Sequence, residues 1–118
     1  AALLWKMVYH SVHSIRELNP DFIVVRHKDL SHDPVNGYRS LYASLGLDYT
    51  PRVEKIILDS TSSDNPAELS RKKTHSVKLD SLASVDNWKK RLTEDEIKRV
   101  REITEEVSHW YYSDSEWP

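Results

Sequence analysis

The chain contains no cysteine and only two glycines among its 118 residues. The absence of cysteine excludes a disulfide framework and any thiolate metal site, and it agrees with the cytoplasmic location that we expect. Because the two glycines stand alone at positions 37 and 46, no glycine-rich loop can be built to cradle a phosphate group. No apolar run approaches the roughly 20 residues of a membrane span, and no signal peptide is evident, so we expect no membrane segment.

The charges are nearly balanced, which limits the classes of partner. Lys and Arg number 17, Asp and Glu number 19, and the formal net charge is −2. This balance provides no general attraction to nucleic acid or to an anionic membrane, so we expect no nucleic-acid partner. The length suits one domain, and we expect a single, partial domain over residues 1–118.

The stretch from residue 22 to residue 47 predicts a strand, a turn and a helix. Phe22 to Val25 form a continuous apolar run that charged residues end, which is typical of a strand covered on both faces of a parallel sheet. Asp33-Pro34 then supplies a helix start, and Gly46 stands where the helix should stop. We therefore predict a strand over residues 22–26 and an α/β fold that is otherwise mostly helical.

Three further helices are predicted, over residues 2–18, after Thr50-Pro51, and from the capping box that begins at Thr93. Residues 59–80 are polar and basic, and they predict a mobile loop. The aromatic run at residues 110–112 has two interpretations: it packs against Trp5 and Tyr9 of the first helix, or it covers a surface that another segment occupies.

The predicted strand has no obvious partner in the chain. Either a weak strand lies in residues 74–80, where apolar and polar positions alternate, or the rest of the sheet lies in residues that this chain does not contain. We favour the second interpretation. The chain also begins inside an apolar pattern, as expected of a fragment of a longer polypeptide.

Several motifs, in their order along the chain, resemble the C-terminal part of sulfotransferases that use 3′-phosphoadenosine 5′-phosphosulfate (PAPS). These motifs are Val25-Arg26-His27-Lys28-Asp29-Leu30, Asp33-Pro34, Leu45-Gly46-Leu47, the basic residues 71–73, and Trp88 through Leu92-Thr93 to Glu96. The resemblance covers roughly residues 3–112 and implies part of a P-loop-like, three-layer α/β fold. It also implies PAPS as the sulfuryl donor of the complete enzyme.

The chain departs from the family pattern in two respects. His27-Lys28 stands where the family has a Tyr-Glu pair, so the acidic group of that pair is missing or reversed in charge. The family's phosphosulfate loop, its upstream arginine and serine for the 3′-phosphate, and its catalytic base precede the matched region. We therefore assign no catalytic residue, and we expect these residues alone to transfer no sulfuryl group and to bind adenosine 3′,5′-bisphosphate weakly at best.

One basic cluster lies in the predicted loop and contains Arg71, Lys72, Lys73, His75 and Lys78. The resemblance implies a lid that closes over the nucleotide, with Arg71, Lys72 and Lys73 as cofactor-binding residues. Arg71 and Lys73 are equal candidates for the 3′-phosphate contact, and arginine has the better geometry for two hydrogen bonds to one phosphate. The alternative is that the charges form an ordinary solvated surface.

The chain has six histidines, a residue type that often binds metals, but their spacing in the sequence does not support a metal site. His10 and His13 lie three positions apart, but no carboxylate completes a ligand set, so we expect no metal. His27 follows the predicted strand, where α/β sheets present functional groups, and it is either catalytic or a partly buried hydrogen-bonding residue.

Two functions remain open. The first is the C-terminal portion of a sulfotransferase that moves a sulfuryl group from PAPS to a hydroxyl or amine acceptor, which the sequence does not identify. The second is a small helical protein-interaction module without catalysis. The expected partners are the nucleotide donor, the acceptor, and either a missing N-terminal part or a second copy of the chain.

Overall fold

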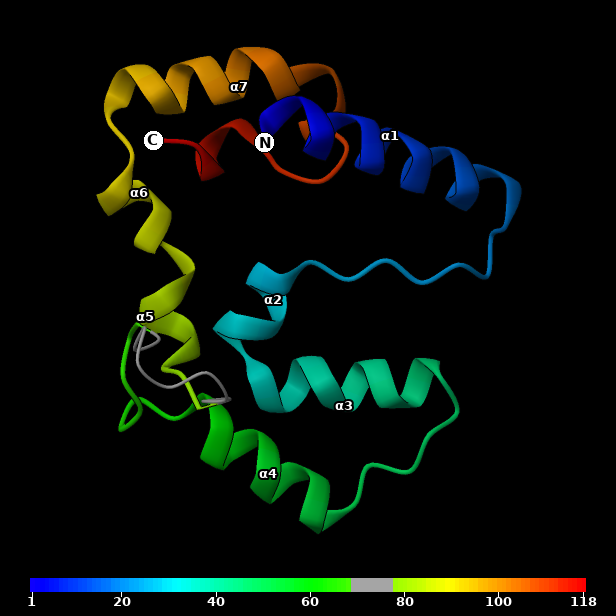
Figure 1. Cartoon of the computed structure of the whole chain (residues 1–118). Helices are drawn as coiled ribbons and strands as arrows, with labels where there is room; N and C mark the ends of the chain where they lie inside the picture. Colours follow the sequence, from blue (N-terminus) through cyan, green and yellow to red (C-terminus); the bar gives the residue numbers. More distant parts are fainter. Residues whose placement is uncertain (69–77) are drawn as a thin grey trace. The chain divides into compact units, whose positions relative to one another are not determined.

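The computed structural model describes residues 1–68 and 78–118. Within these residues the chain forms seven α-helices and one 3₁₀ helix, and it forms no β-strand (Figure 1). The helices are α1 (Ala2–Leu18), α2 (His27–His32), α3 (Pro34–Ser44), α4 (Pro51–Thr61), α5 (Ser81–Val85), α6 (Asn87–Arg91), α7 (Glu94–Ser108) and η1 (Asp114–Glu116). The helix predicted over residues 2–18 is confirmed with the same bounds.

The helices form two compact units. Unit 1 consists of residues 1–24 and 88–118, and unit 2 consists of residues 25–87. Unit 1 therefore joins the two ends of the chain, whereas unit 2 is one continuous segment. The expectation of a single domain over residues 1–118 stays a prediction, and each unit is described by itself.

In unit 1, α1 packs along α7 (Figure 1). Val107 of α7 is fully buried at 0% exposure, and Ile97 is also buried. Thr104 lies on the same buried face, where its hydroxyl donates a hydrogen bond of 2.9 Å to the carbonyl oxygen of Val100. The capping box that begins α7 is confirmed, because Thr93 and Glu96 exchange hydrogen bonds between side chain and backbone.

Aromatic contacts join α1 to the segment that follows α7. The Tyr111 hydroxyl donates a hydrogen bond of 3.1 Å to the carbonyl oxygen of Tyr9, and the two rings meet edge to face with their centroids 5.5 Å apart. Trp5 stacks on Tyr9 at 4.4 Å, and His13 stacks on Trp110 at 3.9 Å. Of the two interpretations of residues 110–112, the packing against the first helix is therefore confirmed.

A different face of α1 is exposed and apolar. Leu18 is 81% exposed and Leu4 is 66% exposed. Other exposed apolar residues of this helix are Leu3, Met7, Val8 and Ile15. Because most large apolar side chains of a packed helix face a neighbour, α1 presents more apolar surface than α7 covers.

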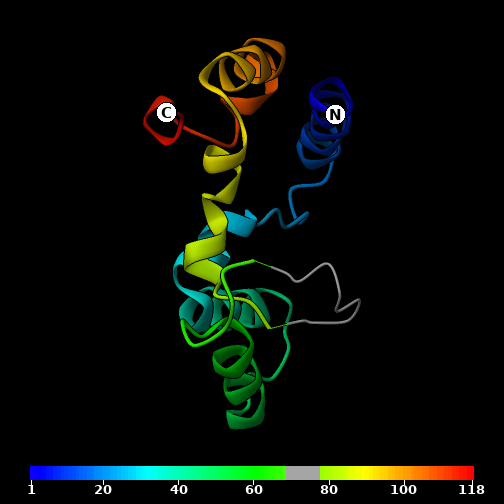
Figure 2. The same ribbon diagram turned by 60° about the vertical axis from the view of Figure 1, so that its left-hand side comes forward.

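In unit 2, α2 packs against α3 and α5, and α3 packs against α4 (Figure 1 and Figure 2). The predicted start of α3 is confirmed, since Asp33 caps the helix and Pro34 is its first residue. Its predicted end is also confirmed. Gly46 adopts a φ of +66°, and the amide of Leu47 donates a hydrogen bond of 2.8 Å to the carbonyl oxygen of Tyr42.

The predicted strand over residues 22–26 is wrong, and with it the three-layer α/β fold class. Residues 22–26 have no regular secondary structure, and α2 begins at the next residue. A strand needs a neighbour for its backbone hydrogen bonds, and no second strand occurs in residues 1–68 or 78–118. The alternative strand in residues 74–80 lies largely outside the described residues, and residues 78–80 are not in a strand.

Candidate functional site

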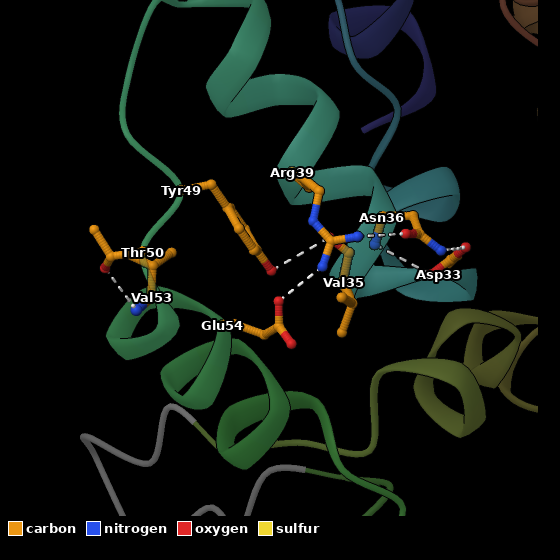
Figure 3. Close-up of polar contacts among 8 residues, drawn as sticks. All are labelled: Asp33, Val35, Asn36, Arg39, Tyr49, Thr50, Val53 and Glu54. Carbon is orange, nitrogen blue, oxygen red and sulfur yellow. Dashed lines mark hydrogen bonds and ion pairs between the residues drawn. The ribbon is translucent and has the colours of Figure 1, made fainter.

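A polar cluster of unit 2 links α3 to α4 (Figure 3). The Arg39 guanidinium donates a hydrogen bond of 3.1 Å to the side-chain oxygen of Asn36, and another of 2.8 Å to the Glu54 carboxylate. The side-chain amide of Asn36 in turn donates a hydrogen bond of 2.8 Å to Asp33. Four side chains from the start of α3 to the first turns of α4 therefore form one chain of hydrogen bonds.

Tyr49 fixes the loop between α3 and α4 beside this polar chain. Its hydroxyl donates a hydrogen bond of 3.3 Å to the carbonyl oxygen of Val35, and the Arg39 guanidinium carbon lies 5.1 Å from the ring centre (Figure 3). Tyr42 meets the ring edge to face at 5.6 Å. Tyr49 is thus held from α3 by a hydrogen bond, a cation and an aromatic ring.

The pKa values of two ionisable groups of the cluster are shifted in opposite directions, and the causes differ. The side-chain and backbone hydrogen bonds from Asn36 lower the pKa of Asp33 below its ordinary value. Desolvation raises the pKa of Tyr49, and the nearby Glu54 carboxylate raises it further. At neutral pH the cluster therefore contains an ionised Asp33 and a protonated Tyr49 hydroxyl.

An open cleft of about 390 Å³ lies beside the cluster, lined by Arg39, Tyr49, Glu54 and residues of the next turns of α4. The described side chains include no paired nucleophile and base there, since the Arg39–Glu54 ion pair and the Tyr49 hydrogen bond are both already formed. The arrangement suits the binding of a polar ligand rather than chemistry on it.

The predicted cofactor-binding residues Arg71, Lys72 and Lys73, with His75, lie outside the described residues, so their roles stay predictions. Of the basic cluster, only Lys78 is described, and it is exposed. The predicted loop over residues 59–80 begins inside α4, which continues to Thr61.

The residues that flank the undescribed segment are tied together within unit 2. The amide of Asp80 donates a hydrogen bond of 3.0 Å to the carbonyl oxygen of Pro66, and Leu79 donates one of 3.0 Å to Ser60. The buried Asn87 side chain donates a hydrogen bond of 2.8 Å to Ala67. Both ends of the segment that carries the predicted lid are therefore anchored to the same unit.

Sequence reasoning missed these anchors and the helix that one of them begins. The Asp80 side chain accepts a hydrogen bond of 2.9 Å from the amide of Ala83 and caps α5. The Ser81 hydroxyl donates one of 3.1 Å to the carbonyl oxygen of Ser31. An Asp before a short apolar run is a recognisable N-cap signal, whereas the pairing of Ser81 with Ser31 has no signal in the sequence.

The histidine candidates fall in separate places. His27 is exposed at the start of α2, where its Nδ1 atom lies 3.5 Å from the hydroxyl of the buried Ser31, one helical turn along. His10 and His13 lie near Trp110 in unit 1. Within residues 1–68 and 78–118 no three His, Asp or Glu side chains are grouped closely enough to hold a metal ion.

The capped starts of α3, α4 and α7 do not by themselves provide a phosphate site for PAPS. Phosphate binding at a helix N-terminus needs backbone amides that the protein leaves available. Asp33, Thr50 and Thr93 already accept hydrogen bonds from the first turns of α3, α4 and α7. Gly37 lies within α3 and Gly46 ends it, so no loop with more than one glycine precedes a helix in the described residues.

Comparison with known proteins finds one partial similarity. The chain is 31% identical over 86 residues to carbohydrate sulfotransferase 5 of Mus musculus, and the match covers 73% of this chain and 22% of that protein. The resemblance noted in the sequence is thus confirmed as a partial relation to a sulfotransferase, of which this chain spans about a fifth. No family model matches the chain, and no solved structure matches it.

The structure also bears on membrane association. In the part of the chain that the structure describes, no helix has both the length and the apolar character needed to cross a bilayer.

Proposed function

We propose that this chain is part of a sulfotransferase that moves a sulfuryl group from PAPS to an acceptor. The observation that carries the proposal is the 31% identity over 86 residues to carbohydrate sulfotransferase 5. By analogy with the name of that relative, we propose a carbohydrate hydroxyl as the acceptor. The cytoplasmic location expected from the sequence stays a prediction.

Local structure supports the motif order on which the resemblance rests. The Asp33-Pro34 start, the Gly46 stop and the Thr93 capping box each adopt the conformation that their residues predict. The Arg26 guanidinium also donates a hydrogen bond of 2.7 Å to Asp29, so the Val-Arg-x-x-Asp motif forms a local ion pair. These contacts support the relation without assigning any residue to catalysis.

We further propose that the exposed face of α1 packs against another part of the sulfotransferase. An apolar cleft of about 490 Å³, lined by Leu4, Trp5, Val8 and Thr104 among others, lies beside α1. Exposed apolar surface of this kind marks an interface, and the relative is several times longer than the matched region. In this proposal, residues outside the match would supply the phosphate-binding loop and the catalytic base.

A chimera tests the sulfotransferase proposal. The region of mouse carbohydrate sulfotransferase 5 that aligns with this chain is replaced by the sequence of this chain, and sulfate transfer from radiolabelled PAPS is measured. We expect transfer above that of a chimera carrying a scrambled insert. A chimera that folds but transfers no more sulfate than the scrambled control would contradict the proposal.

The same chimera tests the predicted lid. Replacing Arg71, Lys72 and Lys73 together by alanine should raise the KM for PAPS, because three cations near the donor phosphates are lost. The matched control replaces exposed Lys98 and Arg99 of α7 and should leave that KM unchanged. Equal transfer by the triple variant and the control would show that the lid assignment is wrong.

A helical interaction module is the second candidate, and the helical structure of the described residues favours it. Such a module should be monomeric, should melt cooperatively and should show dispersed amide signals. A part of a larger domain with an uncovered α1 face should instead associate or remain molten. Analytical ultracentrifugation with thermal melting of the chain distinguishes these two outcomes.

A further inference from the structure

The cleft between the start of α4 and Arg39 of α3 has the size of a ligand site, and the sulfotransferase resemblance assigns no role to it. Its volume of about 390 Å³ falls in the range of roughly 300–1,000 Å³ that is typical of small-molecule sites. All of its lining residues belong to unit 2.

The charges of the lining balance one another. Arg39 and Lys55 are cations, and Glu54 and Asp59 are anions. Arg39 and Glu54 already form an ion pair, with 2.8 Å between nitrogen and oxygen, so neither charge is left uncompensated for a charged ligand. Lys55 and Asp59 lie one helical turn apart on α4 and add one charge of each sign. A lining of this kind favours a neutral ligand that both donates and accepts hydrogen bonds.

The cleft also has apolar surface. Leu58 is half exposed, and it lines the cleft together with Pro51 and the Tyr49 ring. Polar groups beside apolar side chains match a pyranose ring, which carries hydroxyl groups at its edge and C–H groups on its faces. We propose that this cleft binds a short neutral oligosaccharide, a proposal that rests on the carbohydrate acceptor of the proposed function.

The cleft is formed before any ligand arrives. Arg39 is held by Asn36 and Glu54, and Tyr49 is held by its hydrogen bond to Val35 (Figure 3). The Thr50 hydroxyl accepts a hydrogen bond of 3.3 Å from the amide of Val53 and fixes the start of α4. Because these groups are already ordered, a ligand would not have to restrict them on binding.

Titration of the full chain with neutral sugars, followed by amide chemical shifts, tests the site. Maltotriose, cellotriose, chitotriose and lactose serve as probes, and inorganic sulfate is titrated separately. We expect at least one sugar to cause saturable shifts that centre on residues 49–59, and sulfate to cause none there. Carbohydrate affinity at an open cleft of this kind should be weak, with a Kd of about 1 mM.

Variants of exposed residues of α4 make the test specific. Lys55→Ala and Asp59→Ala remove lining groups that take no part in the Arg39–Glu54 pair or in the Thr50 cap, and each should weaken sugar binding about 5-fold. Arg52→Ala is the matched control, because Arg52 is exposed on the same helix and does not line the cleft. It should leave the affinity unchanged.

Three results would overturn the site: no saturable shift with any of the sugars, equal affinity in all three variants, or sulfate binding more tightly than every sugar. The chimera distinguishes this failure from failure of the proposed function. Sulfate transfer by the chimera without sugar binding at the cleft overturns the site alone. Sugar binding at the cleft without transfer overturns the sulfotransferase proposal and supports the site as a carbohydrate-binding surface.

Discussion

Units 1 and 2 are stabilised by different kinds of contact. Unit 1 brings together residues that are far apart in sequence, as the hydrogen bond from Tyr111 to Tyr9 across 102 positions shows. Unit 2 combines local helix caps, in which Asp33, Thr50 and Asp80 cap α3, α4 and α5, with contacts of intermediate range such as the hydrogen bond from Arg39 to Glu54 across 15 positions. The helix starts of unit 2 are therefore encoded locally, whereas unit 1 depends on pairing the two ends of the chain.

The largest expected effect concerns the buried face of α7. Val107→Ala removes two methyl groups from a fully buried position and should destabilise unit 1 by about 2 kcal/mol. Urea unfolding gives the loss of stability, and amide exchange resolved by residue assigns it to α7.

The comparison variant is Ile103→Ala on the same helix, where the side chain is 36% exposed, and its cost should be smaller, about 1 kcal/mol. If Val107→Ala accelerated amide exchange equally in α3 and α4 of unit 2, the two units would unfold together. They would then not be independent in stability.

Asp33 tests the local contacts of unit 2. Asp33→Ala removes the acceptor for the Asn36 amide and should cost about 1 kcal/mol, with faster exchange at the start of α3. Asp33→Asn keeps a side-chain oxygen at the cap and should restore most of that stability. Equal losses in the two variants would show that the cap hydrogen bond contributes little.

The charge of Asp33 adds a pH dependence to the same prediction. Hydrogen bonds from Asn36 hold the pKa of Asp33 below its ordinary value of 3.8. A lowered folded-state pKa means that the unfolded chain binds the proton more readily. The stability that ionised Asp33 contributes is therefore fully present above about pH 4. It is lost as the pH falls through the pKa of Asp33 in the folded protein. Carboxyl titration followed by NMR should give a midpoint below 3.8, and Asp33→Asn should reduce the acid sensitivity of unit 2.

Tyr111→Phe tests the pairing of the chain ends in unit 1. The variant keeps the edge-to-face contact with Tyr9 and loses the hydroxyl that donates to the Tyr9 carbonyl oxygen, which should cost about 0.5–1 kcal/mol. Tyr9→Phe is the control. The Tyr9 backbone carbonyl oxygen accepts the hydrogen bond, so removal of the Tyr9 hydroxyl should leave this bond intact. A larger loss in Tyr9→Phe than in Tyr111→Phe would contradict the assigned bond.

Local chemistry explains which parts of the fold the sequence could predict. The bounds of α1, the caps of α3, α4 and α7, and the turn at Gly46 depend on residues within a few positions of one another. The prediction of a strand over residues 22–26 was wrong, because an apolar run does not reveal whether a partner strand is present. The short helices α2 and α5 were missed, since neither shows a helical apolar period long enough to detect.

The candidate site was less predictable than the fold. Arg39 and Glu54 lie 15 positions apart on two helices, and no spacing rule relates them. The Tyr49 hydroxyl donates a hydrogen bond to the backbone of Val35, and the path of the chain between them, which no sequence pattern shows, decides that contact. The sequence instead directed attention to Arg71, Lys72 and Lys73, whose role in nucleotide binding stays a prediction.

The smallest expected effect is the coupling between Arg39 and Glu54, measured by a double-mutant cycle with Arg39→Gln and Glu54→Gln. Their side chains are 51% and 38% exposed, so water and salt screen the pair, and the coupling should be about 0.5 kcal/mol at low salt. It should fall further near 1 M salt, where the screening length is about 3 Å. The comparison cycle in unit 1 uses Lys6 and Glu106, which form an ion pair in which the Lys6 side chain is 29% exposed and the Glu106 side chain 66% exposed. A coupling in unit 2 that exceeds the unit 1 value several-fold and resists salt would show that Asn36 and Tyr49 desolvate the Arg39–Glu54 pair, and that its strength belongs to the whole cluster rather than to two surface charges.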